Sequence, residues 1–324
     1  MSRSSRVTVD GFWQGVRGLV TPSPADPAIL RGALVIWLVT ALIVVAVLML
    51  LVVTGFSIVW LKLAALLVVF PAVGAVLLVF RLRTGLQAIP LWLETVVQAM
   101  LVTGFCILAS FALASLATPY IDQHLIAADR LLGFDWLTHA RFVHERPWLR
   151  SVLAYAYGTL SWQFPAALCV LAVFGAHRHL QVFLLAWILT LVLILPISGA
   201  LPAKAAFGHY GLSPISDYPI SRAVPGAFDL IEALRAGDKR QLLSYDFDGI
   251  VTFPSFHAAA GLLLAWGFWA VPWLRWPMLL LNLVMIASTP AIGAHYLVDV
   301  IAGQLLAMLS LRIAQRMLDA NGID

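Results

Sequence analysis

The sequence predicts an all-α integral membrane protein, on the basis of its composition and the length of its apolar runs. Hydrophobic residues make up 62% of the 324 residues, charged residues only 11%, and the mean hydropathy is +0.94. These values lie well outside the usage of soluble domains. Apolar runs of about 18 or more residues, the length that a helix needs to cross a bilayer, recur along most of the chain.

About eight membrane spans are expected, with short breaks between the last three. They are residues 32–55, 57–80, 91–117, 151–174, 180–199, 255–272, 275–291 and 293–315. Both cysteines lie inside these spans, so that neither a disulfide framework nor a metal site is indicated. We find no phosphate loop, internal repeat, coiled coil or nucleic-acid motif.

The N-terminal residues 1–31 have neither the apolar segment nor the cleavage site of a signal peptide, and we interpret them as a cytoplasmic tail. With this tail inside, arginine is in excess on the inner side, as the positive-inside rule expects. Two longer segments, 118–150 and 200–253, then lie outside. In a bacterial inner membrane they would face the periplasm, and in a eukaryotic cell the Golgi lumen.

The first outer segment carries apolar residues at helical spacing, namely Ile121, Leu125, Ala128 and Leu132. This pattern favours a helix lying in the membrane interface, with Trp136 and Trp148 as aromatic anchors. A packed connector and a lid over a substrate are both compatible with it. The second outer segment is the most polar part of the chain, and a loop of its length in a compact domain is usually functional.

Two histidines stand at helix entrances. His257 lies in TFPSFHAAAG (252–261), at the start of the sixth span, and His295 lies in PAIGAHYLVDVIAG (290–303), between the seventh and eighth. Two helices later the chain has returned to the same face of the membrane. Both histidines therefore lie on the outer side at similar depth, where they could meet.

The spacing of His295 and Asp299 indicates a chemical role. On a helix, residues four apart lie on one face, about 6 Å apart along the axis. A carboxylate there can take the Nδ1 proton of the imidazole and leave Nε2 as a nucleophile or base. His257 has no acidic residue within a turn, which suits a general acid.

These residues resemble two signatures of the type-2 phosphatidic acid phosphatase superfamily. PSFHAA (254–259) is similar to the motif P-S-G-H, with Phe256 in place of glycine. STPAIGAHYLVD (288–299) is similar to S-R-x5-H-x3-D, with Thr289 in place of arginine. The first signature, K-x6-R-P, is not found. Loss of the glycine and the arginines is typical of the inositol phosphorylceramide synthase-like group, which ADRLLGFDW (128–136) and LPAKAAFGHYG (201–211) also resemble.

The resemblance covers roughly residues 91–315 and implies a six-helix core. The chain would then consist of the tail 1–31, two extra transmembrane helices in 32–80, and a catalytic membrane domain in 81–324. It further implies a lipid phosphatase or phosphotransferase that works without a metal ion or cofactor. By this resemblance His295 attacks phosphorus, Asp299 orients it, and His257 protonates the leaving alkoxide.

The substrate implied is a membrane phospholipid or another lipid-linked phosphate, with water, an alcohol or a sugar as acceptor. Developing phosphoryl charge needs hydrogen-bond donors, and the family arginines are absent. Basic residues of the second outer segment are candidates to replace them: Lys204, Arg222, Lys239 and Arg240. Backbone amides at the start of the sixth span are further donors. Ser255, His209 and Tyr210 are also expected near the substrate.

Two other function classes remain open from the sequence. A lipid transporter or flippase would need polar residues at mid-membrane on several helices, and only Lys62 and Glu94 are found there. A catalytically inactive scaffold would explain the missing arginines. The intact set of His257, His295 and Asp299 favours an enzyme over both.

Overall fold

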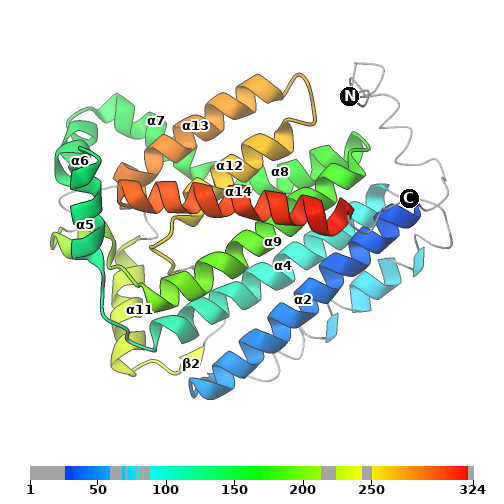
Figure 1. The fold of residues 1–324 in the computed structure, drawn as a ribbon, viewed down its shortest axis with the longest axis horizontal. Helices are drawn as coiled ribbons and strands as arrows, with labels where there is room; N and C mark the ends of the chain where they lie inside the picture. Colours follow the sequence, from blue (N-terminus) through cyan, green and yellow to red (C-terminus); the bar gives the residue numbers. More distant parts are fainter. Residues whose placement is uncertain are drawn as a thin grey trace.

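The computed structural model describes residues 26–58, short stretches between 68 and 83, and residues 88–212, 224–242 and 250–319, which form a bundle of helices (Figure 1). The helices are α2 (Pro27–Val53), α4 (Ala88–Ala114), α5 (Asp122–Leu131), α6 (Trp136–His144), α7 (Pro147–Gly158), α8 (Leu160–Val173), α9 (His177–Ala200), α10 (Ala205–His209), α11 (Val224–Ala236), α12 (Phe256–Phe268), α13 (Arg275–Ile292) and α14 (Leu297–Asp319). Two short strands, β1 (Ser57–Ile58) and β2 (Gln241–Leu242), pair in parallel. The predicted all-α membrane class is confirmed.

Among the residues that the structure describes, five helices are long and apolar enough to cross a membrane, namely α2, α4, α9, α13 and α14. A sixth crossing is possible if α7 and α8 act together. Six of the eight expected spans thus correspond to these elements. Half of the expected span 57–80, including Lys62, lies outside the described residues.

The fourth expected span is broken rather than continuous, because α7 and α8 meet at an angle of 44°. At the break, the Thr159 hydroxyl donates to the carbonyl of Ala156 over 2.6 Å and accepts from Gln163 Nε2 over 2.7 Å. A side chain that competes for backbone hydrogen bonds, next to the flexible Gly158, favours a helix end at this position.

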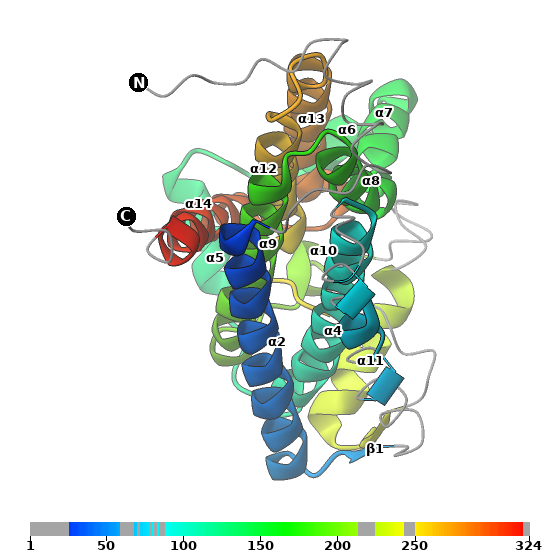
Figure 2. The ribbon, with the colours of Figure 1, turned by 90° about the vertical axis from the view of Figure 1, so that its right-hand side faces the viewer.

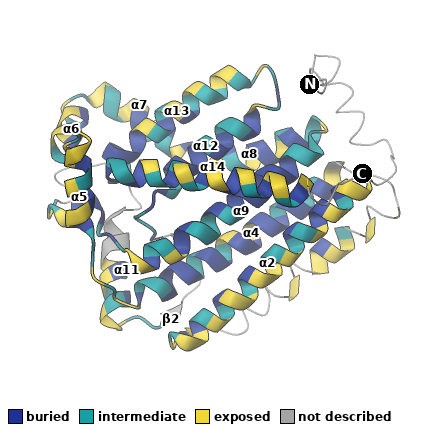
Figure 3. Ribbon diagram, viewed as in Figure 1, coloured by how far each residue is buried: buried dark blue, intermediate teal, exposed yellow. Residues whose placement is uncertain are grey.

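The sixth expected span is shorter than predicted. Helix α12 has 13 residues, which extend about 20 Å, against the roughly 30 Å of a bilayer core. It packs against α8, α9, α13 and α14, and much of its surface is buried (Figure 3). Gly261 allows close packing here, since a Cβ atom at this position would lie 2.7 Å from Ile286 Cγ1. Helix α12 is therefore a central element of the bundle.

Different helices meet at the two ends of the bundle. At one end Gln181 Nε2 of α9 donates to the carbonyl of Ile29 in α2, and Arg178 of α9 pairs with Asp319 of α14. These contacts bring the starts of α2 and α9 together with the end of α14. The opposite end carries α5, α6, α10 and α11 (Figure 1), and α2 runs the length of the bundle beside α4 and α9 (Figure 2).

The segment 118–150 forms α5 and α6, and it buries part of the expected apolar face together with two carboxylates. Trp136 is 2% exposed and donates from Nε1 to the carbonyl of Pro290, so it is a core residue and not an interface anchor. Leu132 is exposed, whereas Asp122 and Asp129 are buried. Trp148 is exposed at the surface. Asp122 and Asp129 are buried because both carboxylates accept hydrogen bonds from donors of other segments.

Candidate active site

His257 lies in the first turn of α12, which Ser255 starts. The Ser255 hydroxyl oxygen accepts from the amide of Ala258 over 3.3 Å, as an N-cap residue does. The Ser255 amide donates to the carbonyl of Asp299 over 3.1 Å. Gly303 of α14 permits this approach, because a Cβ atom there would overlap the Ser255 carbonyl oxygen. The entrance of α12 is therefore held directly against α14.

His295 lies in the turn between α13 and α14, not on α14 itself. Ala294 adopts a left-handed conformation with φ of 58°, and the His295 amide donates to the carbonyl of Thr289 over 3.3 Å. The expected placement of His295 and Asp299 on one helical face is thus wrong in detail. A tight turn brings the histidine back over the first turn of α14, where the carboxylate lies.

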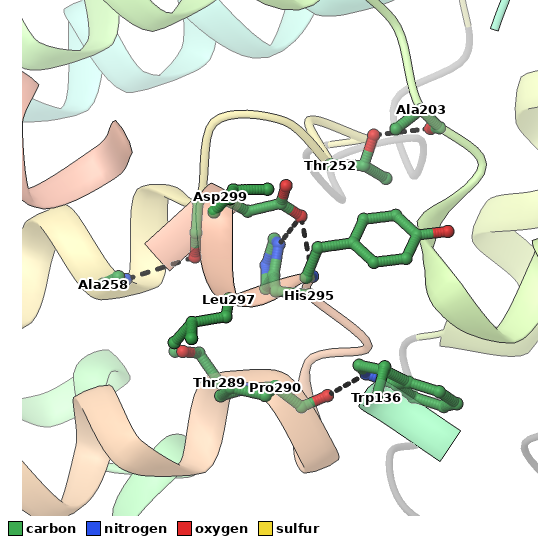
Figure 4. Close-up of polar contacts among 12 residues, drawn as sticks. Trp136, Ala203, Thr252, Ala258, Thr289, Pro290, His295, Leu297 and Asp299 are labelled. Atoms are coloured by element: carbon green, nitrogen blue, oxygen red, sulfur yellow. Dashed lines mark hydrogen bonds and ion pairs between the residues drawn. The ribbon is translucent and has the colours of Figure 1, made fainter. Parts of the chain in front are cut away.

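The imidazole and the carboxylate meet in the expected orientation. His295 Nδ1 lies 3.4 Å from Asp299 Oδ2, and the same oxygen accepts from the amide of Tyr296 over 3.0 Å (Figure 4). Asp299 is fully buried and His295 is 6% exposed. Because a carboxylate only accepts hydrogen bonds, Nδ1 is the protonated nitrogen, and Nε2 keeps its lone pair.

His257 approaches the same space from the other side. Its ring stacks on Tyr157 of α7, with centroids 4.0 Å apart and an interplanar angle of 8°. A Cβ atom at Gly293 would lie 2.9 Å from both Tyr157 Cε2 and His295 Cδ2. Tyr157 therefore has His257 on its ring face and the turn of Gly293 and His295 at its ring edge. His257 is partly exposed, which leaves it accessible to a ligand.

Two buried aspartates of α5 hold the His295 turn in place, and sequence reasoning missed both. Asp129 accepts from the amides of Leu297 and Val298, each over 2.9 Å, at the start of α14. Asp122 accepts from the Tyr296 hydroxyl over 2.9 Å. Burial raises the pKa of Asp129, while its two hydrogen bonds from backbone amides oppose this rise.

A signal for these aspartates was present in the sequence. They are seven residues apart, so they lie on one face of a helix, two turns apart. That face also contains Leu125, which is buried. Carboxylates that share a face with a buried leucine indicate a tertiary contact with hydrogen-bond donors.

Two of the basic residues expected near a phosphate, Lys204 and Arg240, have partners of their own. The Lys204 amide donates to Asp122, but its ammonium group pairs with Glu232 Oε1 at 3.2 Å and lies 5.0 Å from the Tyr120 ring. The Arg240 guanidinium lies over the Phe56 ring, next to the short strands. Arg222 lies outside the described residues.

The other expected site residues have contacts within the protein, and their place beside a substrate stays a prediction. His209 and Tyr210 form one layer, in which Tyr210 stacks on Trp136 with an interplanar angle of 13°. Ser255 is fully buried and caps α12. Thr289, at the position of the family arginine, is also buried and donates to the carbonyl of Ile286, so it adds no positive charge.

Comparison with known proteins identifies the family to which the chain belongs. No curated protein and no solved structure matches the chain. A family model described as PAP2 superfamily matches residues 123–313, which include most of α5, both histidines and Asp299. The match covers more than half of the chain. The chain therefore belongs to the PAP2 superfamily.

Proposed function

We propose that the protein is a membrane-embedded phosphotransferase or phosphatase acting on lipid phosphates through a phosphohistidine. Membership of the PAP2 superfamily supports a phosphatase or phosphotransferase in general. The observation that carries the proposal is the contact of His295 Nδ1 with Asp299 Oδ2, with His257 on the same small space. One imidazole is paired with a carboxylate and the other is not, as a nucleophile and an acid require.

The reaction divides into two displacements. In the first, His295 Nε2 forms a bond to phosphorus, the bond from phosphorus to the leaving oxygen breaks, and His257 gives its proton to that oxygen. In the second, water or an alcohol attacks phosphorus, the bond to Nε2 breaks, and His257 takes the proton of the attacking oxygen. Asp299 holds the imidazole of His295 in one tautomer and stabilises its positive charge.

The start of α12 is the best candidate for binding the phosphoryl oxygens in place of the missing arginines. The first amides of a helix have no partner within the helix and carry partial positive charge. At α14 these groups face Asp129 and Asp299. At the start of α12, the Ser255 hydroxyl oxygen accepts a hydrogen bond from one amide of the first turn, that of Ala258. The amides of Phe256 and His257 then remain for an anion.

The head-group transfer of inositol phosphorylceramide synthases is the more specific form of this proposal. It rests on the motif resemblance of the two histidine segments and on the 201–211 and 128–136 segments. In this form the acceptor is an alcohol such as a polyol head group, and the donor is a phospholipid. Release of inorganic phosphate in place of exchange would support hydrolysis instead.

The proposed location is the outer face of a bacterial inner membrane, with the N-terminus inside. The site lies at the end of the bundle that carries α5 and α6, opposite to the starts of α2 and α9 (Figure 1). Leu131→Cys, at a residue 90% exposed on α5, should react with a membrane-impermeant maleimide added outside intact cells. Labelling that requires lysis would reverse the orientation.

The decisive experiment is turnover of a panel of phospholipids and lipid-linked phosphates by the purified protein. His257→Ala should lower kcat about 10²–10⁴-fold, the contribution of a general acid. His295→Ala should lower it at least as far and abolish acid-labile labelling of the protein by a ³²P-lipid. His124→Ala, at an exposed histidine of α5, is the matched control and should retain activity. Unchanged turnover by His295→Ala would rule the proposal out.

A further inference from the structure

Three buried polar side chains form a chain of hydrogen bonds at the break between α7 and α8. Asn282 Nδ2 of α13 donates to Gln163 Oε1 of α8 over 2.8 Å, and Gln163 Nε2 donates to the Thr159 hydroxyl oxygen over 2.7 Å. That hydroxyl donates in turn to the carbonyl of Ala156, on the last turn of α7. All three side chains are at most 1% exposed. The chain therefore links α13, α8 and the end of α7 inside the bundle.

Stability alone does not account for these polar groups. The helices that they join are among those expected to cross the membrane, where a buried polar atom is costly unless it is hydrogen-bonded. Asn282 Oδ1 is buried and has no hydrogen-bond partner among the described residues. Apolar side chains of similar volume would avoid that cost, since replacing both partners of a buried pair can be neutral or stabilising. What an apolar contact lacks is a fixed direction and length, and these the hydrogen bonds supply.

This chain of hydrogen bonds reaches the ring that supports His257. Tyr157 is two residues before Thr159, and its ring stacks on the imidazole of His257. The edge of the same ring adjoins the turn of Gly293 and His295, which directly follows α13. Helices α7 and α13 pack side by side (Figure 1). A shift of the end of α7 along α13 would therefore move the Tyr157 ring relative to both imidazoles.

We propose that Gln163 and Asn282 are positioning residues, which set the end of α7 against α13 and so hold the Tyr157 ring on His257. They act through Tyr157 and donate to or accept from no reacting group. The inference rests on the proposed function, because its effect on turnover requires His257 to act as the acid. It assigns a role in the reaction to two residues in the apolar interior of the bundle.

Gln163→Met is the most selective way to break the link between the helices. Methionine has nearly the volume of glutamine, and volume-conserving changes are tolerated best in a packed interior. The former partners each keep another acceptor: Asn282 Nδ2 still donates to the carbonyl of Met278 over 2.8 Å, and the Thr159 hydroxyl still donates within its own turn. The midpoint of thermal unfolding should therefore stay close to that of the wild type.

The first measurement is the turnover of a lipid phosphate by Gln163→Met. kcat should fall up to about fivefold, as it would on loss of the stacked ring, while KM changes less than about twofold. In Tyr157→Leu protein the same substitution should lower kcat no further, because the ring through which it acts is absent. An unchanged kcat, or an equal fall in both backgrounds, would overturn the inference.

Gln181→Met is the matched control. Gln181 is also a fully buried glutamine whose Nε2 joins two helices, by donating to the carbonyl of Ile29 over 2.7 Å, but it lies at the opposite end of the bundle. Its loss should leave kcat within about twofold of the wild type. A fall as large as that in Gln163→Met would show a general effect of a lost buried amide and count against positioning. If Gln163→Met does not fold, Asn282→Leu breaks the same link from α13 and carries the same expectation.

A second measurement separates this inference from the proposed function. Tyr157 is replaced by 3-fluorotyrosine, whose ¹⁹F resonance senses the stacked imidazole, and His257→Ala gives the resonance of the unstacked ring. Gln163→Met should move the signal towards that position, and Gln181→Met should not. A signal that moves in a protein without turnover would reject the enzyme and retain the positioning. Turnover by the wild type with an unmoved signal in Gln163→Met would do the reverse.

Discussion

The two histidines stand at two helix entrances that are held in different ways. The turn that carries His295 is held by ionisable groups, since Asp299, Asp129 and Asp122 all bond to it. The start of α12, which carries His257, is held by neutral groups. There a serine caps the helix, and a tyrosine ring stacks on the imidazole.

This difference matches the different demands of the proposed roles. A nucleophile must keep one tautomer and one position, for which charge-assisted hydrogen bonds are the strongest available means. An acid only has to reach the leaving oxygen. The same difference places two carboxylates at the start of α14, where they meet the positive end of that helix. Four substitutions test whether the two entrances depend on these different supports.

The largest effect is expected at the carboxylate that caps α14. Asp129→Ala removes the acceptor of two backbone amides, and each amide left unpaired costs about 1–3 kcal/mol. The free energy of unfolding, measured by denaturant titration in detergent, should fall by about 2–5 kcal/mol. Glu145→Ala, at a side chain 70% exposed, is the control and should cost less than about 1 kcal/mol. Similar losses in both variants would contradict an anchored turn.

The next effect is expected where the two entrances touch. Gly303→Ala places a methyl group on the Ser255 carbonyl oxygen, so that the start of α12 must move away from α14. Overpacking of this kind costs about 1–3 kcal/mol, and a displacement of about 1 Å at a reacting group can lower kcat about 10²-fold. Gly104→Ala is the control, since a Cβ atom there meets no atom within 4 Å. Wild-type kcat in Gly303→Ala would show that this contact is unimportant.

A smaller effect is expected from the hydroxyl that joins Tyr296 to Asp122. Tyr296→Phe removes one hydrogen bond to a carboxylate, while the Lys204 amide still donates to the same group. The free energy of unfolding should fall by about 1.5 kcal/mol. Tyr155→Phe, at a side chain 71% exposed, should leave it unchanged and serves as the control. A loss of kcat without loss of stability would instead assign the hydroxyl to the reaction.

The smallest effect is expected at the neutral support of His257. Tyr157→Leu removes the ring that stacks on the imidazole, an interaction worth about 1 kcal/mol, so kcat should fall about fivefold. Tyr157→Phe keeps the ring and should restore kcat. If the phenylalanine variant is as slow as the leucine variant, the hydroxyl and not the stacking is what His257 requires.

The fold could be predicted only as far as local patterns reach. Apolar runs identified five of the crossing helices, because the cost of burying polar groups in lipid acts on every residue of a span. The break at Thr159 was missed, since it arises from a single side chain that competes for a carbonyl. The short length of α12 was missed because its apolar pattern continues to Val271, past the last helical residue.

What the sequence by itself determined is the class of the protein and the pairing of His295 with Asp299, because membrane burial and spacing of a few residues are properties of the local chain. Tertiary structure alone decided what holds these groups: Asp122 and Asp129 act on a turn about 170 residues further along. It also paired Lys204 with Glu232 of another segment. The physical reason is that a carboxylate acts on whichever donors the fold brings within about 3 Å, and no local pattern records that partner.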